Sequence, residues 1–181
     1  MSIGILGNYI LRMKFGTRDV PIDPSALHTF SIIQDLNRIV PYVLLEMSDS
    51  DGVLTHLSPF DKQMSRISVE IATTQNMQDF NIFNFHCYKK EPVAIYQNAS
   101  RYCVEGLLNI PNLFNPTFCR GNFGSVKTFV EKIAIQELLA DRVDISNGLN
   151  VEKNILQPNW SNAQLFKYLK DNMGDEYSYC Y

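Results

Sequence analysis

The chain has 181 residues and a mass of 20.8 kDa, which corresponds to one ordinary domain or to a core domain with a small appendage. Hydrophobic residues make up 45% of it and charged residues 19%, a balance that argues against global disorder. The net charge is −3, the largest basic cluster is the pair Lys89–Lys90, and no apolar run approaches the roughly 18 residues of a membrane span. A nucleic-acid-binding surface that releases counterions, a membrane-spanning helix and a signal peptide are therefore not expected.

The first 106 residues carry mainly β-strand patterns. An apolar run at 42–47 is followed by Asp49-Ser50-Asp51-Gly52 and by a second run at 53–57. This order predicts a β-hairpin, because both central residues of the favoured tight turn need a positive φ. Residues 67–71 alternate between apolar and polar side chains, as in a strand with one buried face. Further strands are expected at 80–88, 93–96 and 102–104.

After residue 106 the apolar period becomes that of a helix. Gly121-Asn122-Phe123-Gly124-Ser125 is interpreted as a tight turn that leads into a helix over 126–141, with Ser125 as its N-cap. Residues 155–160 are expected to be extended, because Pro158 disfavours helix at the residue before it. Ser161-Asn162-Ala163-Gln164 is a capping-box pattern, which predicts a second helix that ends near Gly174.

These patterns predict an α+β fold with a division near residue 106. A small antiparallel β-barrel or sandwich is expected over 1–106, where closing the sheet would hide its edges. A helical elaboration over 107–174 would pack on or beside it, with the lone tryptophan, Trp160, packing helix against sheet. The tail over 175–181 carries alternating tyrosines and is interpreted as a partner contact or as an exposed segment.

Candidate residues for catalysis or metal binding are few. The cysteines never fall two positions apart, as zinc clips and thioredoxin-like motifs require, and the first three are expected to be buried, reduced thiols. The histidines have no metal-ligand spacing. These residues are Cys87, Cys103, Cys119, Cys180, His28, His56 and His86.

Two further motifs are weak as ligand sites. The glycine-rich segment before residue 126 could place a phosphate at a helix N-terminus, but it lacks the lysine of a P-loop and is interpreted as a turn and cap. Asp49 could begin a calcium loop, but Phe60 stands at the twelfth position, where an EF-hand needs a glutamate. No catalytic, cofactor-binding or metal-binding residue is assigned.

Four stretches, taken in order over about residues 20–173, resemble the hub proteins of phage tails and baseplates, which are related to the spike-bearing proteins of type VI secretion machines. They look like an early strand with its exit, the family's first D-x-x-G hairpin, the following strand, and a helical insertion in which an N-W-S element precedes a second short helix. They are Pro21-Ile22-Asp23-Pro24 with 30–38, residues 42–49 with Asp51-Gly52-Val53-Leu54, Ser58-Pro59-Phe60-Asp61 with 67–71, and 123–139 with 155–169.

The resemblance implies a structural, non-enzymatic protein of the virion tail or baseplate, made in the host cytoplasm. Hub proteins are typically trimers of tube-like β-barrel domains that join the six-fold tail tube to the three-fold spike around a channel for DNA. The implied partners are copies of this chain in a ring (trimer or hexamer), the tail tube protein, and the spike or other baseplate proteins. DNA would only pass transiently through the lumen, no membrane is involved, and the family carries over no catalytic residue and no cofactor.

One departure from the family pattern leaves alternatives open. Typical hubs continue into a second tube-like barrel after the second helix, whereas this chain stops at Tyr181. Another polypeptide or additional copies would then supply the second barrel, or the chain is a shortened adaptor, and the tail over 175–181 would join the next chain. Another tail component with the same fold, such as a tube or terminator subunit, is the first alternative. A small enzyme that uses Cys87 or Cys119 with a distant histidine is the second.

Overall fold

A computed structural model describes residues 4–173 of the chain, except 7, 17, 36–37, 53, 55–56, 62–63, 96–99 and 146–150. The chain divides into two units, which are described separately. The first unit contains Met1–Gln34 and Val40–Asn109, and the second contains Asp35–Ile39 and Ile110–Tyr181. The tail over 175–181, with its three tyrosines, lies outside the described residues.

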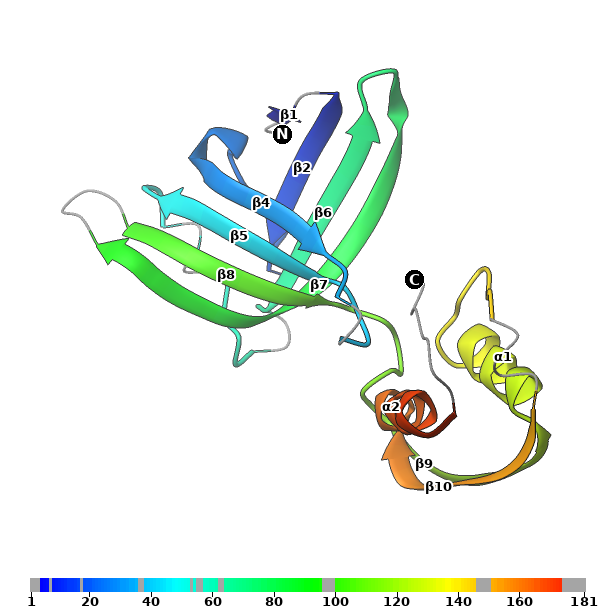
Figure 1. Ribbon diagram of the computed structural model, residues 1–181. Coiled ribbons are helices and arrows are strands. Elements are labelled where there is room, and N and C mark those ends of the chain that lie inside the picture. The colour runs from blue at the N-terminus through cyan, green and yellow to red at the C-terminus, as the bar shows by residue number, and fades with distance from the viewer. Residues whose placement is uncertain are drawn as a thin grey trace. The chain divides into compact units, whose positions relative to one another are not determined.

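The first unit is an eight-stranded antiparallel sheet with the order β1-β2-β6-β7-β8-β5-β4, in which β3 also pairs with β2 (Figure 1). A short 3-10 helix, η1 (Pro24–Ala26), precedes β4. The strands predicted around 42–47 and 67–71 are confirmed as β5 and β6. The strand bounds are β1 (Gly4–Leu6), β2 (Tyr9–Phe15), β3 (Val20–Pro21), β4 (Leu27–Ile33), β5 (Tyr42–Asp49), β6 (Arg66–Thr73), β7 (Asn76–Ile95) and β8 (Ser100–Leu108).

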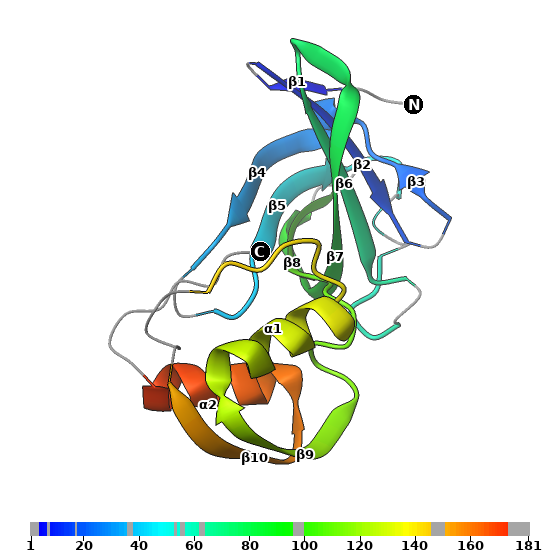
Figure 2. The same cartoon turned by 90° about the vertical axis from the view of Figure 1, so that its right-hand side faces the viewer.

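Strand β7 turns the corner of this sheet. Its residues 76–86 pair with β6 and its residues 85–95 pair with β8, so that only Phe85 and His86 have paired residues on both sides. Register shifts at Cys87/Lys89 and at Pro92/Ala94 interrupt the ladder with β8, and such bulges bend a strand. Figures 1 and 2 show the resulting strongly curved sheet, which forms a half-barrel. The strands predicted separately at 80–88 and 93–96 therefore belong to one strand, β7, which the structure describes as far as Ile95.

The core of the first unit lies between the two halves of the bent sheet. Alternate residues of each strand point into it, as the period of a strand requires. Phe15, Ile67 and Phe85 come from the β2–β6–β7 half, and Val43 comes from the β5 side; all four are almost completely buried. Gly106 of β8 faces the same core, where an added Cβ would lie 3.2 Å from side-chain atoms of Ile67, Phe85 and Val43. The absence of a side chain at Gly106 therefore permits this close packing.

The hairpin predicted over 42–57 is wrong. Gly52 has the positive φ of 69° that the turn requires, but no strand returns along β5, because β4 and β8 already occupy its two edges. Leu54 and Leu57 are instead buried loop residues, and Lys90 Nζ donates hydrogen bonds to their carbonyl oxygens at 3.0 and 2.8 Å. Positions 53, 55 and 56 lie outside the described residues.

The second unit places two helices on one face of a two-stranded antiparallel ribbon (Figure 2). The ribbon consists of β9 (Thr117–Ser125) and β10 (Glu152–Ser161), and the helices are α1 (Val126–Gln136) and α2 (Asn162–Met173). The extended conformation predicted for 155–160 is confirmed, whereas the glycine-rich segment before α1 is the end of a strand rather than a turn. The apolar core of this unit joins both helices to β10 through Val126, Phe129, Ile133, Ile155, Leu165 and Leu169.

Both predicted helix starts are confirmed. The Ser125 side chain accepts a hydrogen bond from the Thr128 amide at 3.3 Å. Ser161 and Gln164 form the reciprocal capping box, with the Ser161 amide donating to Gln164 Oε1 at 2.9 Å and the Gln164 amide donating to Ser161 Oγ at 3.3 Å. Helix α1 ends at Gln136 rather than at residue 141, and Leu139 beyond it has a left-handed φ of 58°.

A central arginine links every element of the second unit. Arg120 on β9 donates from Nε to Gln157 Oε1 at 2.7 Å and from Nη2 to Asn162 Oδ1 at 2.7 Å. It also forms an ion pair with Glu137, the C-cap residue of α1. Asn162 in turn donates to Glu137 Oε2 at 2.9 Å. These groups connect β9, β10, the end of α1 and the start of α2 in one hydrogen-bonded network.

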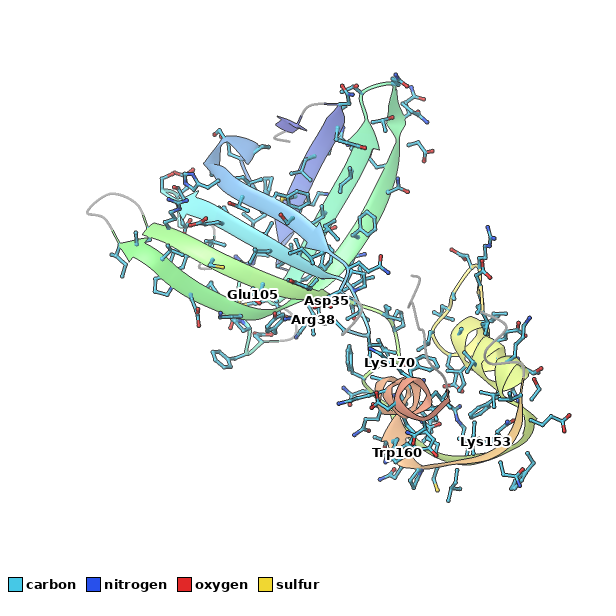
Figure 3. The ribbon with its side chains drawn as sticks, viewed as in Figure 1. Asp35, Arg38, Glu105, Lys153, Trp160 and Lys170 are labelled. Atoms are coloured by element: carbon cyan, nitrogen blue, oxygen red, sulfur yellow. The ribbon has the colours of Figure 1, made fainter. Side chains whose placement is uncertain are left out.

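The capping box gives a first testable prediction. Replacing Ser161 by alanine is expected to lower the free energy of unfolding of the second unit by about 1 kcal/mol, because the Gln164 amide loses its acceptor at the start of α2. Urea titration followed by tryptophan fluorescence measures this change, since Trp160, labelled in Figure 3, is the only tryptophan of the chain. Its ring centroid lies 5.3 Å from that of Tyr168 in α2. Ser58→Ala, in the first unit, is the control and should leave this transition in place.

Candidate assembly surface

The two ends of the sheet in the first unit are formed by different kinds of strand. At one end, the short strands β1 and β3 both lie along β2. At the other end, β4 pairs only with β5 among the described residues. The sequence of β4, Leu-His-Thr-Phe-Ser-Ile-Ile, contains no proline and no Asp, Glu, Lys or Arg, which are the residues that commonly protect an edge strand from pairing. The outer edge of β4 is therefore suited to strand addition by another chain.

The outer face of β5, β8 and β7 carries charges of both signs that lie in close pairs. Arg101 Nε lies 2.8 Å from Glu46 Oε1, and Lys89 Nζ lies 3.1 Å from Glu105 Oε1 and 3.0 Å from Glu91 Oε2. Hydrogen bonds to Glu91 and Glu105 raise the pKa of Lys89 to about 12. Glu105, labelled on β8 in Figure 3, thus sits in a mixed-charge ladder and not in a patch of one sign. Such a face has no concentrated positive potential that would bind a polyanion such as DNA.

Large apolar side chains are exposed on both units. In the first unit, Phe60 is 99% exposed in the loop before β6. In the second unit, the ribbon face opposite the helices presents Phe123 and Leu156, which are 84% and 65% exposed, together with Cys119 and Pro158. Isolated exposed apolar residues are common, but clustered or fully exposed aromatic residues are typical of protein–protein contacts. These side chains therefore add to the case for a chain that assembles with others.

The cysteines correct the expectation of three buried thiols. Cys87 is buried on the inner face of β7, whereas Cys103 is half-buried on the outer face of β8 and Cys119 is exposed on β9. All three are free thiols, and Cys180 lies outside the described residues. The difference arises because Cys103 and Cys119 fall on strand positions that face away from the two cores. Burial raises the pKa of Cys87 to about 11, and burial with the neighbouring Glu105 raises the pKa of Cys103.

Thiol alkylation should follow this order of exposure. We expect iodoacetamide to modify Cys119 first, Cys103 more slowly and Cys87 slowest in the folded chain, because burial limits access to the Cys87 thiol and raises its pKa to about 11. Peptide-resolved mass spectrometry measures each site separately, and alkylation in urea supplies the fully accessible reference. Modification of Cys87 at the rate of Cys119 in the folded protein would contradict the buried position.

His28 and His86, the histidines that the structure describes, each lie within hydrogen-bond distance of a serine hydroxyl. His86 Nδ1 lies 2.7 Å from the Ser65 hydroxyl, a pairing that the sequence did not suggest. Ser65 is completely buried, so this hydroxyl is closed to a substrate. His28 Nε2 lies 2.7 Å from the Ser48 hydroxyl between β4 and β5, and His56 lies outside the described residues.

Neither a metal cluster nor a membrane span is found in the described part of the chain. No three His, Cys, Asp or Glu side chains there are grouped closely enough to hold a metal ion. No helix there has both the length and the apolar character needed to cross a membrane. The Asp49 carboxylate, considered above for a calcium loop, instead accepts a hydrogen bond from the Leu54 amide at 3.3 Å.

The fold is similar to the solved structure of a phage tail protein. The 43 kDa tail protein of prophage MuSo2 from Shewanella oneidensis matches with a TM-score of 0.55 and 12% identity, over 91% of this chain and 49% of that chain. A component of the Escherichia coli type VI secretion system, described as structurally similar to bacteriophage T4 tail proteins, matches with a TM-score of 0.43 and 11% identity, over 91% of this chain and 40% of that chain. No protein-family model and no curated protein sequence matches the chain. The chain spans about half the length of the MuSo2 protein, and the predicted α+β fold is confirmed.

Proposed function

We propose that this chain is a structural, non-enzymatic subunit of a phage tail or baseplate, of the hub type, which assembles as a ring around the tail axis. The observation that carries the proposal is a half-barrel sheet, similar in fold to a phage tail protein, whose end strand β4 is unprotected by charge or proline. An edge of this kind is completed most simply by another copy.

The unlike ends of the sheet favour a ring. The β4 end of one copy would meet the β1–β2–β3 end of the next, which is a head-to-tail contact. Head-to-tail contacts close into rings when the rotation between copies allows it. The paired charges of the outer face and the net charge of −3 would let DNA pass through such a ring without strong binding.

The proposal also assigns a role to each region of the chain. The barrel-like region over 1–106 forms the ring, the region over 107–174 and the tail over 175–181 contact neighbours, and the tail tube protein and the spike or other baseplate proteins bind the ring faces. The chain spans about half the length of the similar tail protein. The burial of Cys87, which raises its pKa to about 11, weighs against Cys87 as the nucleophile of a cysteine-dependent enzyme.

Light scattering of the purified chain over a range of concentrations tests the proposal. A hub subunit is expected to form a trimer of about 62 kDa, three times 20.8 kDa, whereas a hexamer of about 125 kDa, six times that mass, would favour a tube or terminator subunit. Electron microscopy of the same sample should show closed rings. A monomer at all concentrations, with no ring after addition of a tail tube protein, would contradict assembly around the tail axis.

A further inference from the structure

We draw no further inference here: the strongest candidate, the exposed apolar patch of Phe123 and Leu156 on the face of the β9–β10 ribbon opposite the helices, carries none because nothing in the structure shows what covers it.

Discussion

Replacing Arg120 by alanine is expected to lower the free energy of unfolding of the second unit by about 3 kcal/mol, the cost of removing one partner from a partly buried ion-pair network. The Arg120 guanidinium bonds to Gln157 and Asn162 at 2.7 Å each and pairs with Glu137. Alanine would leave the Glu137 carboxylate without its cation and would remove donors from two amide oxygens. Gln157 and Asn162 are completely buried, so water replaces these bonds poorly.

Urea titration followed by Trp160 fluorescence measures the effect, because that residue lies in the second unit. Arg120→Lys tests the geometry: it keeps the charge, but an ammonium cannot reproduce the planar set of donors, so most of the loss should remain. Lys127→Ala is the control, since Lys127 and Glu131 form an exposed pair at 3.9 Å that should contribute no more than about 0.5 kcal/mol. Equal midpoints for Arg120→Ala and Lys127→Ala would show that the network does not stabilise the unit.

Gly106→Ala is expected to destabilise the first unit by about 2 kcal/mol, although alanine is normally the better strand residue. The added Cβ would lie 3.2 Å from Ile67 Cδ1, Phe85 Cβ and Val43 Cγ1. The Phe85 Cβ is fixed by the backbone of β7, so the clash cannot be relieved by a side-chain rotation. The strand itself would have to move in a close-packed core.

Gly121→Ala is a matched control for this prediction. Its added Cβ would also meet an atom at 3.2 Å, but that atom belongs to the Phe123 ring, which is exposed and free to rotate away. This variant should change the free energy of unfolding by no more than about 0.5 kcal/mol. Hydrogen exchange of peptides from β7 and β8 reports the first unit separately, and unchanged protection in Gly106→Ala would contradict the packing described here.

Local signals in the sequence predicted the helix starts well. The capping box at Ser161 and the cap at Ser125 involve groups three residues apart, and both are present as predicted. The alternation at 67–71 likewise depends on neighbouring residues and lies in β6. Features of this kind are readable because the residues that determine them are adjacent in the chain.

Long-range pairing could not be read in the same way. Asp51-Gly52 is a strong local hairpin signal, yet β5 pairs with β8, whose sequence lies more than fifty residues beyond β5. The partner of β9 is β10, which follows the intervening helix α1, so the glycines of β9 suggested a turn. Arg120 contacts residues 17 to 42 positions away, and no spacing rule connects them.

Only part of the candidate assembly surface could be predicted from the sequence. The lack of charge and proline over 27–33 can be read directly, but it matters only because β4 is the last strand of the sheet. Ser58-Pro59-Phe60-Asp61 has the composition of a turn, but nothing in it shows that the Phe60 side chain is 99% exposed. The resemblance to hub proteins predicted the class of fold, whereas the position of the edge strand β4 required the structure.

The central position of β8 in the sheet also has a consequence for folding during synthesis. β5 lies between β4 and β8, and β8 is the last strand of the first unit to leave the ribosome. Until Leu107 emerges and pairs with Tyr42, one edge of β5 and one edge of β7 stay open. Non-local pairing of this kind slows folding and exposes strand edges to other nascent chains. Neighbouring ribosomes on one message would therefore bring together chains that can pair wrongly before the sheet is complete.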